Sequence, residues 1–126
     1  MTAPSAPHLP RRAPIDAYGQ GGFRFAGMSH RGSLLCLPSG IWAWAVRAPA
    51  DIDEAALAPA LAEGNDIELF LLGTGPAPWL VPEALRWHFR DRHIVVEAMP
   101  TGAAVRTYNI VLGENRRVAA GLIAVD

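Results

Sequence analysis

A nearly continuous apolar segment in the middle of the chain, Ile67–Leu72, runs directly into the turn Gly73-Thr74-Gly75-Pro76. Only Glu68 interrupts its apolar character, so the segment does not alternate as a strand with one solvated face would. Short apolar runs bounded by turn signals are typical of strands covered on both faces. A buried helix would have a similar composition, but two glycines and a proline directly after the run favour a strand.

Strands and helices are predicted to alternate after this segment. Leu85 and Phe89 are four residues apart and would meet on one face of a helix. Thr101 is predicted as the N-cap of a later helix, and Gly113 as the residue that stops it. The predicted elements are a helix at 81–90, a strand at 93–97, a helix at 102–112 and a strand at 117–125. This order favours parallel neighbouring strands joined by helical crossovers.

The first half of the chain is rich in short strands and tight turns. Ser33–Leu37 and Ile41–Val46 flank the turn Pro38-Ser39-Gly40, which predicts an antiparallel hairpin. Shorter strands are predicted at 15–18 and 23–25. A helix is predicted to open near Asp51 or Asp53, to be short or to begin near Pro59, and to end at Gly64-Asn65.

These patterns predict the fold class. We expect an α/β protein, a three-layer domain with a mixed sheet flanked by helices and a β-hairpin-rich N-terminal extension. Residues 1–12 are predicted to be a flexible tail, and residues 13–126 a single α/β domain.

Composition excludes several classes of function. With 51% hydrophobic residues and a net charge of −1, the chain is globular and lacks the basic excess of a nucleic-acid binder. It contains no Lys, which excludes a Lys nucleophile or a Schiff base. Cys36 is the single cysteine and lies among leucines, so we expect a buried, inert thiol. No apolar run is long enough to span a bilayer and no secretory signal is visible, so a cytoplasmic location is expected.

The chemistry-bearing residues do not form a recognised active site. His8, His30, His88 and His93 lack the spacing of a metal site. The Gly73-x-Gly75 turn is half of a dinucleotide fingerprint, but the third glycine position holds Pro78. No Gly-x-Ser-x-Gly nucleophile motif occurs. We therefore predict no catalytic residue, no metal and no cofactor, and the sequence favours a non-enzymatic protein while leaving an enzyme as the alternative.

One crevice could still bind a ligand. If the central strand and the strand at 93–97 are parallel neighbours, their carboxyl ends and the start of the last helix face the same crevice, where open α/β sheets bind ligands. Helix N-termini attract anions, and Arg106 could add a charged group. The alternative is a purely structural role, in which Arg106 pairs with a carboxylate and Thr101 only caps the helix. The candidate ligand-binding residues are Gly73, Thr74, Gly75, Thr101, Gly102, Arg106 and Asn109.

The segments Thr101–Asn109 and Gly113–Ala120, together with Leu71–Gly75, resemble a small family of uncharacterised bacterial and archaeal proteins. That family includes the mitochondrial respiratory complex I assembly factor 3. The resemblance covers about residues 15–125 and implies a three-layer α/β domain with a mixed sheet and a β-rich extension. It implies no established reaction, cofactor or catalytic set. The family often has an acidic residue where this chain has Pro100.

Two functions are compatible with these observations. The first is a non-enzymatic assembly or interaction factor for a respiratory-type membrane complex, with a complex subunit or another assembly factor as its protein partner. An exposed Trp79 in the loop 76–79 could contribute to the partner surface, unless it folds back onto the core. The alternative is a small-anion or metabolite-binding protein, or a minor enzyme, that uses the crevice. Edge strands in the first half could be protected by a homodimer or covered within the monomer.

Overall fold

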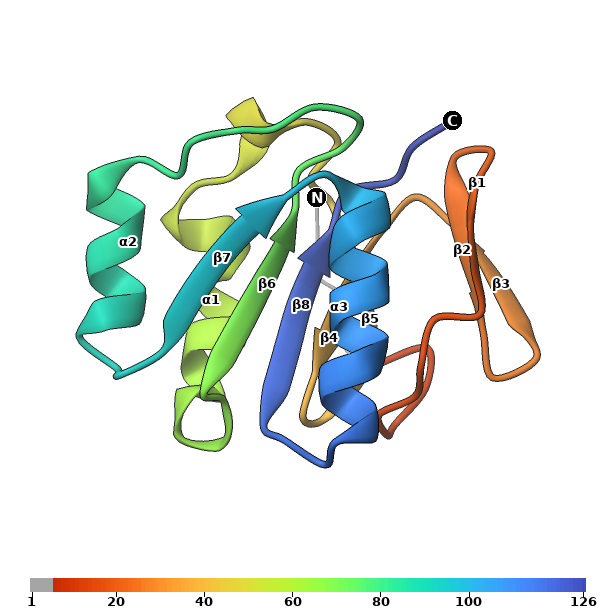
Figure 1. Cartoon of the computed structure of the whole chain (residues 1–126), viewed down its shortest axis with the longest axis horizontal. Coiled ribbons are helices and arrows are strands. Elements are labelled where there is room, and N and C mark those ends of the chain that lie inside the picture. The colour runs from red at the N-terminus through yellow and green to blue at the C-terminus, as the bar shows by residue number, and fades with distance from the viewer. Residues whose placement is uncertain (1–5) are drawn as a thin grey trace.

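The computed structural model of the chain describes residues 6–126 and has a five-stranded mixed sheet at its centre. The strands of this sheet lie in the order β5-β4-β8-β6-β7. Helices α1 and α2 cover one face and α3 covers the other (Figure 1). The predicted three-layer α/β fold is confirmed. The strands are β4 (Ser33–Leu37), β5 (Gly40–Trp44), β6 (Leu69–Gly73), β7 (Val95–Met99) and β8 (Val118–Leu122).

Strand β6 is the predicted apolar segment, and it lies between β8 and β7, parallel to both. All five of its residues are buried. Phe70 and Leu72 belong to the core on the side of α1 and α2, whereas Leu69 and Leu71 belong to the core on the side of α3. Because successive strand residues point to opposite faces, a strand with both faces covered needs apolar residues throughout.

The three helices are α1 (Glu54–Ala62), α2 (Glu83–Arg90) and α3 (Thr101–Gly113). Asp53 caps α1, since its side chain accepts a hydrogen bond from the Ala56 N–H at 2.8 Å. Pro59 lies inside α1, so the alternative in which the helix begins near this proline is wrong.

Strands β4 and β5 form the predicted antiparallel hairpin, with Leu35 opposite Trp42. Strand β4 also pairs antiparallel with β8, which makes the sheet mixed. Cys36, in β4, is fully buried as expected. Burial raises the pKa of its thiol to about 12, so it is protonated and unreactive at neutral pH.

A second, three-stranded antiparallel sheet lies beside α3 (Figure 1). Its strands are β1 (Ala17–Gly19), β2 (Gly22–Phe25) and β3 (Met28–Arg31). Phe23 and Phe25 project from β2 into the core on the side of α3. This sheet is the predicted N-terminal extension, although β3 was not predicted as a strand.

Part of the predicted tail lies against the main sheet. The His8 N–H donates to the Ile41 carbonyl at 2.8 Å, and the Ile41 N–H donates to the Leu9 carbonyl at 2.9 Å. The remaining predicted tail residues 1–5 lie outside the described part of the chain. The division of the chain into a tail and one domain stays a prediction.

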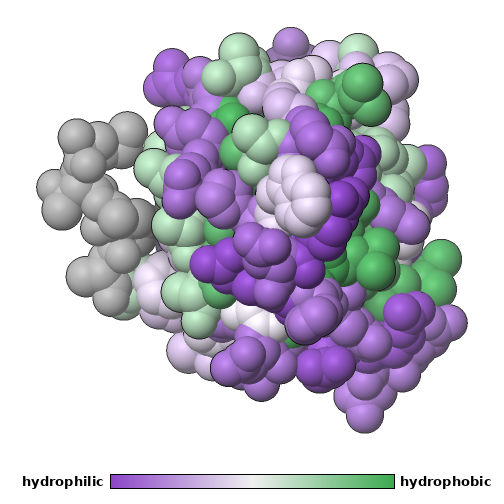
Figure 2. All heavy atoms as spheres, turned by 90° about the vertical axis from the view of Figure 1, so that its left-hand side faces the viewer, coloured by the Kyte–Doolittle hydropathy of each residue, from purple (hydrophilic) through white to green (hydrophobic). Residues whose placement is uncertain are grey.

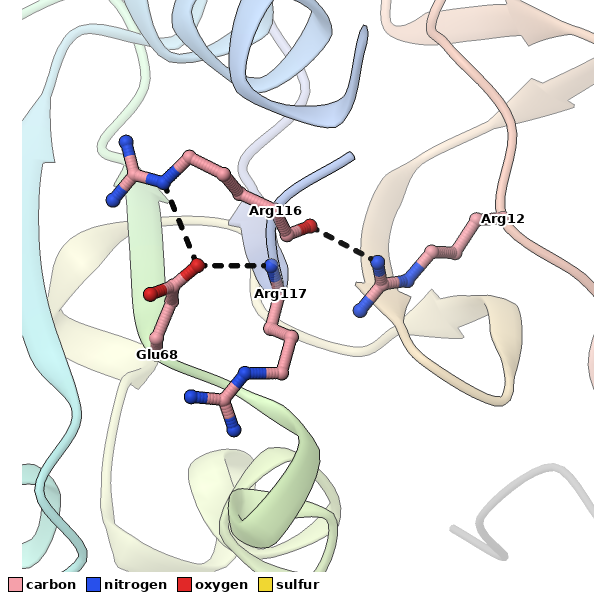
Figure 3. A network of polar contacts seen from close by, with 4 residues as sticks. All are labelled: Arg12, Glu68, Arg116 and Arg117. Atoms are coloured by element: carbon pink, nitrogen blue, oxygen red, sulfur yellow. Dashed lines mark hydrogen bonds and ion pairs between the residues drawn. The ribbon is translucent and has the colours of Figure 1, made fainter. Parts of the chain in front are cut away.

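The starts of β6 and β8 are joined by a polar network (Figure 3). The Glu68 carboxylate accepts hydrogen bonds from the Arg117 N–H at 3.1 Å and from Arg116 Nε at 3.4 Å. Arg12 donates to the Arg116 carbonyl at 3.1 Å. The Arg117 hydrogen bond, assisted by the Arg116 charge, lowers the pKa of Glu68. The one charged residue of the apolar segment therefore serves to join neighbouring strands.

Two predicted boundaries are corrected. The strand predicted from His93 begins at Val95, because His93 has a φ of 59° and lies in a turn. The last helix includes Gly113, and Asn115 is the residue beyond it that adopts a positive φ, of 62°. Within residues 6–126, no helix combines the length and apolar character needed to cross a membrane.

Candidate functional site

The predicted crevice lies at the junction between the end of β6 and the start of α3. In the register of β6 and β7, Gly73 is paired with Met99, so the two parallel strands end side by side. The Thr101 N–H donates to the Gly75 carbonyl at 2.9 Å. The structure therefore brings Gly73, Thr74 and Gly75 together with the first residue of α3, as the sequence predicts.

Thr101 occupies this junction with its side chain. It is completely buried, and its hydroxyl accepts a hydrogen bond from the Gly75 N–H at 2.9 Å and donates one to the Ile123 carbonyl at 2.7 Å. A Cβ atom on Gly73 would lie only 3.2 Å from the Thr101 Cα. Gly73 thus allows the helix to approach the strand closely, and the Thr101 hydroxyl joins the ends of β6 and β8 to α3.

The prediction that Thr101 is the N-cap of the last helix is wrong. Pro100 holds the N-cap position, with a φ of −54° and a ψ of 150°, and no side chain caps the helix. Threonine is favoured at N-caps because its hydroxyl can bond a nearby backbone N–H. Here the hydroxyl instead bonds backbone groups of two distant segments.

Thr74 is also engaged within the protein. It is 1% exposed, and its hydroxyl donates to the Ala77 carbonyl at 2.6 Å. Its backbone N–H donates to the Met99 carbonyl at 2.9 Å. Thr74 therefore fixes the loop that leaves β6, and its hydroxyl and backbone N–H are both engaged within the protein.

The other three candidates share one face of α3, because Gly102, Arg106 and Asn109 are spaced by four and three residues. This face is turned toward the segment that leads into β1. The Asn109 side chain accepts from the Ile15 N–H and donates to the Ile15 carbonyl, both at 2.8 Å. A Cβ atom on Gly102 would meet the Tyr18 hydroxyl. Asn109 thus holds the N-terminal extension by hydrogen bonds, and Gly102 leaves room for the Tyr18 side chain.

Arg106 differs from the other candidates. It is exposed, and its guanidinium forms no hydrogen bond or ion pair with any of residues 6–126. The structural alternative, in which Arg106 pairs with a carboxylate, therefore has no support from the described residues. A free guanidinium can bind an anion or a partner's carboxylate. The ligand-binding role of the seven candidate residues stays a prediction.

Metal-binding groups do not gather at this junction in the described part of the chain. Over the described residues, no group of three or more His, Cys, Asp or Glu side chains could hold a metal ion. His8 and His30 lie close together, with ring centroids 4.5 Å apart, but far along the chain from the candidate residues. Burial, and then the neighbouring His8, lower the pKa of His30.

A hollow that sequence reasoning did not identify lies on the three-stranded sheet. Its volume is about 520 Å³, and it is open to solvent. Arg24 and Ser29 are paired across β2 and β3, and Arg31 is paired with Gly22 two residues further along. The polar residues at the hollow include Gln20, Arg24, Ser29, His30 and Arg31. No local sequence signal marks such a hollow, since it forms by antiparallel pairing of short strands.

The chain is similar to proteins whose length it matches closely. It is 36% identical over 121 residues to an uncharacterised protein of Rhodobacter capsulatus, covering 96% of this chain and 92% of that protein. A crystal structure described as an outer membrane protein from Bartonella henselae superposes with a TM-score of 0.91 at 50% identity. That superposition covers 94% of this chain and 100% of the Bartonella chain.

The chain is also similar to a protein named as an assembly factor. It is 32% identical over 116 residues to the mouse NADH dehydrogenase [ubiquinone] 1 alpha subcomplex assembly factor 3, which corresponds to 91% of this chain. The match covers 62% of the mouse protein, so the chain spans about three fifths of that relative. The family model described as "Protein of unknown function (DUF498/DUF598)" matches residues 15–123. The chain therefore belongs to the DUF498/DUF598 family.

Proposed function

We propose that the protein is a non-enzymatic assembly or interaction factor that binds a protein partner. The partner in this proposal is a subunit, or another assembly factor, of a respiratory-type membrane complex. The similarity to assembly factor 3 supports the class of function. Because the chain spans 62% of that relative, the complex on which it acts is part of the proposal.

The structural observation that carries the proposal is the closed junction between β6 and α3. The hydroxyls of Thr74 and Thr101 and the N–H of Gly75 are hydrogen bonded within the protein. When a ligand displaces the hydrogen-bond partner of a buried polar group, breaking that bond costs free energy. A conventional small-molecule site at this position would carry that cost, whereas a protein partner can bind to the outer surface.

The surface offers apolar side chains for such a partner. Of the two alternatives for Trp79, the structure has the second, because Trp79 is partly buried against the core on the side of α1 and α2. Leu80, next in the chain, is 82% exposed, and Trp87 on α2 is 50% exposed. Exposed aromatic and aliphatic side chains are common at protein interfaces.

Binding of a small anion near Gly73, Thr74, Gly75 and Arg106 is the alternative proposal. Its support is the exposed guanidinium of Arg106, one turn into α3. Titration with inorganic phosphate tests it, through a rise in melting temperature that Arg106→Ala abolishes. A phosphate-dependent rise of that kind would favour the anion-binding function over the assembly function.

Affinity capture tests the assembly proposal. The tagged protein is purified from mildly solubilised membranes of its host, beside an Arg106→Ala variant as the control for the anion alternative. We expect both to recover a subunit of the NADH–ubiquinone oxidoreductase complex or another of its assembly factors. Repeated captures that recover neither would contradict the proposal. Fractionation of the same cells tests the cytoplasmic location, which we also propose.

A further inference from the structure

Strand β7 is an edge of the five-stranded sheet, and its outer side is unpaired among the described residues. The Val95 N–H donates to the Glu68 backbone carbonyl at 3.0 Å, and the Met99 carbonyl accepts from the Thr74 N–H at 2.9 Å. These bonds show that the odd-numbered residues of β7 face β6. Since alternate residues of a strand direct their backbone groups to opposite sides, Val96 and Ala98 direct theirs away from the sheet.

The opposite edge of the sheet is treated differently. There the segment containing His8 and Leu9 forms a bridge to Ile41 in β5, with hydrogen bonds of 2.8 and 2.9 Å. Within residues 6–126, a further segment thus bridges one edge at Ile41, and none pairs with the other edge. An open edge is a template to which an extended segment of another chain can add as a further strand.

The side chains of β7 determine which segment would match it. Val95 is 58% exposed and Glu97 is also exposed. Both lie on the face of the sheet that carries α3, because they are in register with Leu69 and Leu71. Figure 2 views the molecule from the side that carries α2. Hydrophilic side chains dominate this side, and hydrophobic ones gather toward the right of the view, where the face of the sheet with α3 lies. Strand β7 therefore offers an apolar contact beside one negative charge.

A second copy of this chain matches that edge poorly. Strand β7 contains no basic residue. Antiparallel self-pairing through the outward backbone groups of Val96 and Ala98 sets Glu97 opposite Val95, Glu97 or Met99 of the other copy, so no register places a basic residue opposite it. Like charges directly opposite one another are destabilising, whereas opposite charges stabilise a strand pair by about 0.2–1 kcal/mol. Charge complementarity therefore favours a different chain with a basic residue at that position.

We propose that the β7 edge binds an extended segment of a partner protein, which adds beside β7 and carries Arg or Lys opposite Glu97. This inference rests on the proposed interaction function and names its surface. The backbone groups of Val96 and Ala98 supply the hydrogen bonds, and Glu97 supplies the charge preference.

Two variants isolate these contributions. Ala98→Pro removes an outward N–H that takes no part in the pairing with β6, so the sheet is retained. Glu97→Arg reverses the exposed charge, and Glu114→Arg, at the exposed end of α3, is the matched control. Unfolding midpoints close to that of the unaltered protein establish that each variant is folded.

The probe is a pair of capped pentapeptides, Thr-Val-Arg-Val-Thr and Thr-Val-Glu-Val-Thr, titrated into isotope-labelled protein and followed by amide chemical shifts. We expect shifts at Val96 and Ala98, with the Arg peptide binding about two- to fivefold more tightly than the Glu peptide. The order is reversed in Glu97→Arg and kept in Glu114→Arg. Ala98→Pro weakens binding of both peptides.

Three results would overturn the inference. The first is the absence of shifts on β7 at millimolar peptide, or equal binding of the two peptides. The second is a dimer in sedimentation equilibrium with Val96 and Ala98 protected from exchange, which would assign the edge to a second copy. The third is a captured partner that Ala98→Pro and Glu97→Arg both retain, which would refute this surface while leaving the proposed function intact.

Discussion

The backbone N–H of Gly75 and the side-chain hydroxyl of Thr101, 26 residues apart in the chain, form a buried hydrogen bond of 2.9 Å. This bond closes the exit of the central strand onto the first turn of α3. In open α/β sheets, a crevice at this position is a common place for a ligand. In this protein a threonine side chain occupies it, and its contribution to the free energy of unfolding can be measured.

Thr101→Val removes the hydroxyl and keeps the size of the side chain. The Gly75 N–H and the Ile123 carbonyl then lose their partner in a buried place, where each unsatisfied group costs about 1–3 kcal/mol. We expect the free energy of unfolding, measured by urea denaturation, to fall by about 2–4 kcal/mol. Thr101→Ser retains the hydroxyl and is expected to lose less. Equal losses in the two variants would show that the hydroxyl is not what matters.

Asn109→Ala tests the attachment of the N-terminal extension to α3. The Asn109 amide forms two hydrogen bonds of 2.8 Å with the backbone of Ile15, which is buried. Their loss should cost about 1–3 kcal/mol and speed hydrogen exchange at Ile15. Exchange at Phe70, in the central strand, serves as the internal reference. If Ile15 exchanged no faster relative to Phe70, the proposed attachment would be wrong.

Two glycines should respond to alanine with opposite signs. A Cβ atom on Gly121 would lie 2.8 Å from the buried Trp44 ring, so Gly121→Ala should destabilise the core by about 1–3 kcal/mol. A Cβ atom on Gly113, at the end of α3, would meet nothing within 4 Å. Gly113→Ala should therefore stabilise the protein, by up to about 1 kcal/mol. Thermal unfolding of the pair distinguishes them, and changes of the same sign would contradict the packing described for β8.

Glu68 should make the stability depend on pH. Its pKa is lowered in the folded protein, first by the Arg117 N–H and then by the Arg116 charge. Its stabilisation is therefore present above the pKa of the unfolded chain and lost as the pH falls through the lower, folded value. The melting-temperature difference between the unaltered protein and Glu68→Gln should shrink between about pH 7 and about pH 3.

The control for this experiment is Glu114→Gln, because Glu114 is exposed and its carboxylate makes no hydrogen bond or ion pair among residues 6–126. That variant should follow the unaltered protein across the pH range. A Glu68→Gln difference that stayed constant with pH would mean that the carboxylate's charge does not contribute to folding.

The central strand and its neighbours could be predicted because their signals are local. An apolar run that ends in glycines has few outcomes, and a strand–helix–strand order leads to parallel pairing. The predicted closeness of Gly75 and Thr101 followed from that topology, and the structure has it. In contrast, β3 contains Met28, Ser29, His30 and Arg31, none of which is Val, Ile, Thr, Phe, Tyr or Trp, so its sequence carried little strand signal.

Whether the candidate site is open or filled could not be predicted, because that depends on contacts between residues far apart in the chain. The Thr101 hydroxyl bonds Ile123, and Asn109 bonds Ile15, 94 residues away. A threonine before a helix has the local pattern of an N-cap, whether or not a distant carbonyl claims its hydroxyl. The two alternatives for Trp79 stayed open for the same reason, since its proline-rich loop gives no sign that the core lies within reach.

The amount of assembled NADH–ubiquinone oxidoreductase in membranes of a host strain without this gene tests the central claim most directly. The protein is proposed to act through a partner rather than through a reaction at the junction of β6 and α3. The account predicts that assembled complex falls in the deletion strain and is restored by the unaltered gene and by Arg106→Ala. A normal amount of complex in the deletion strain would contradict it.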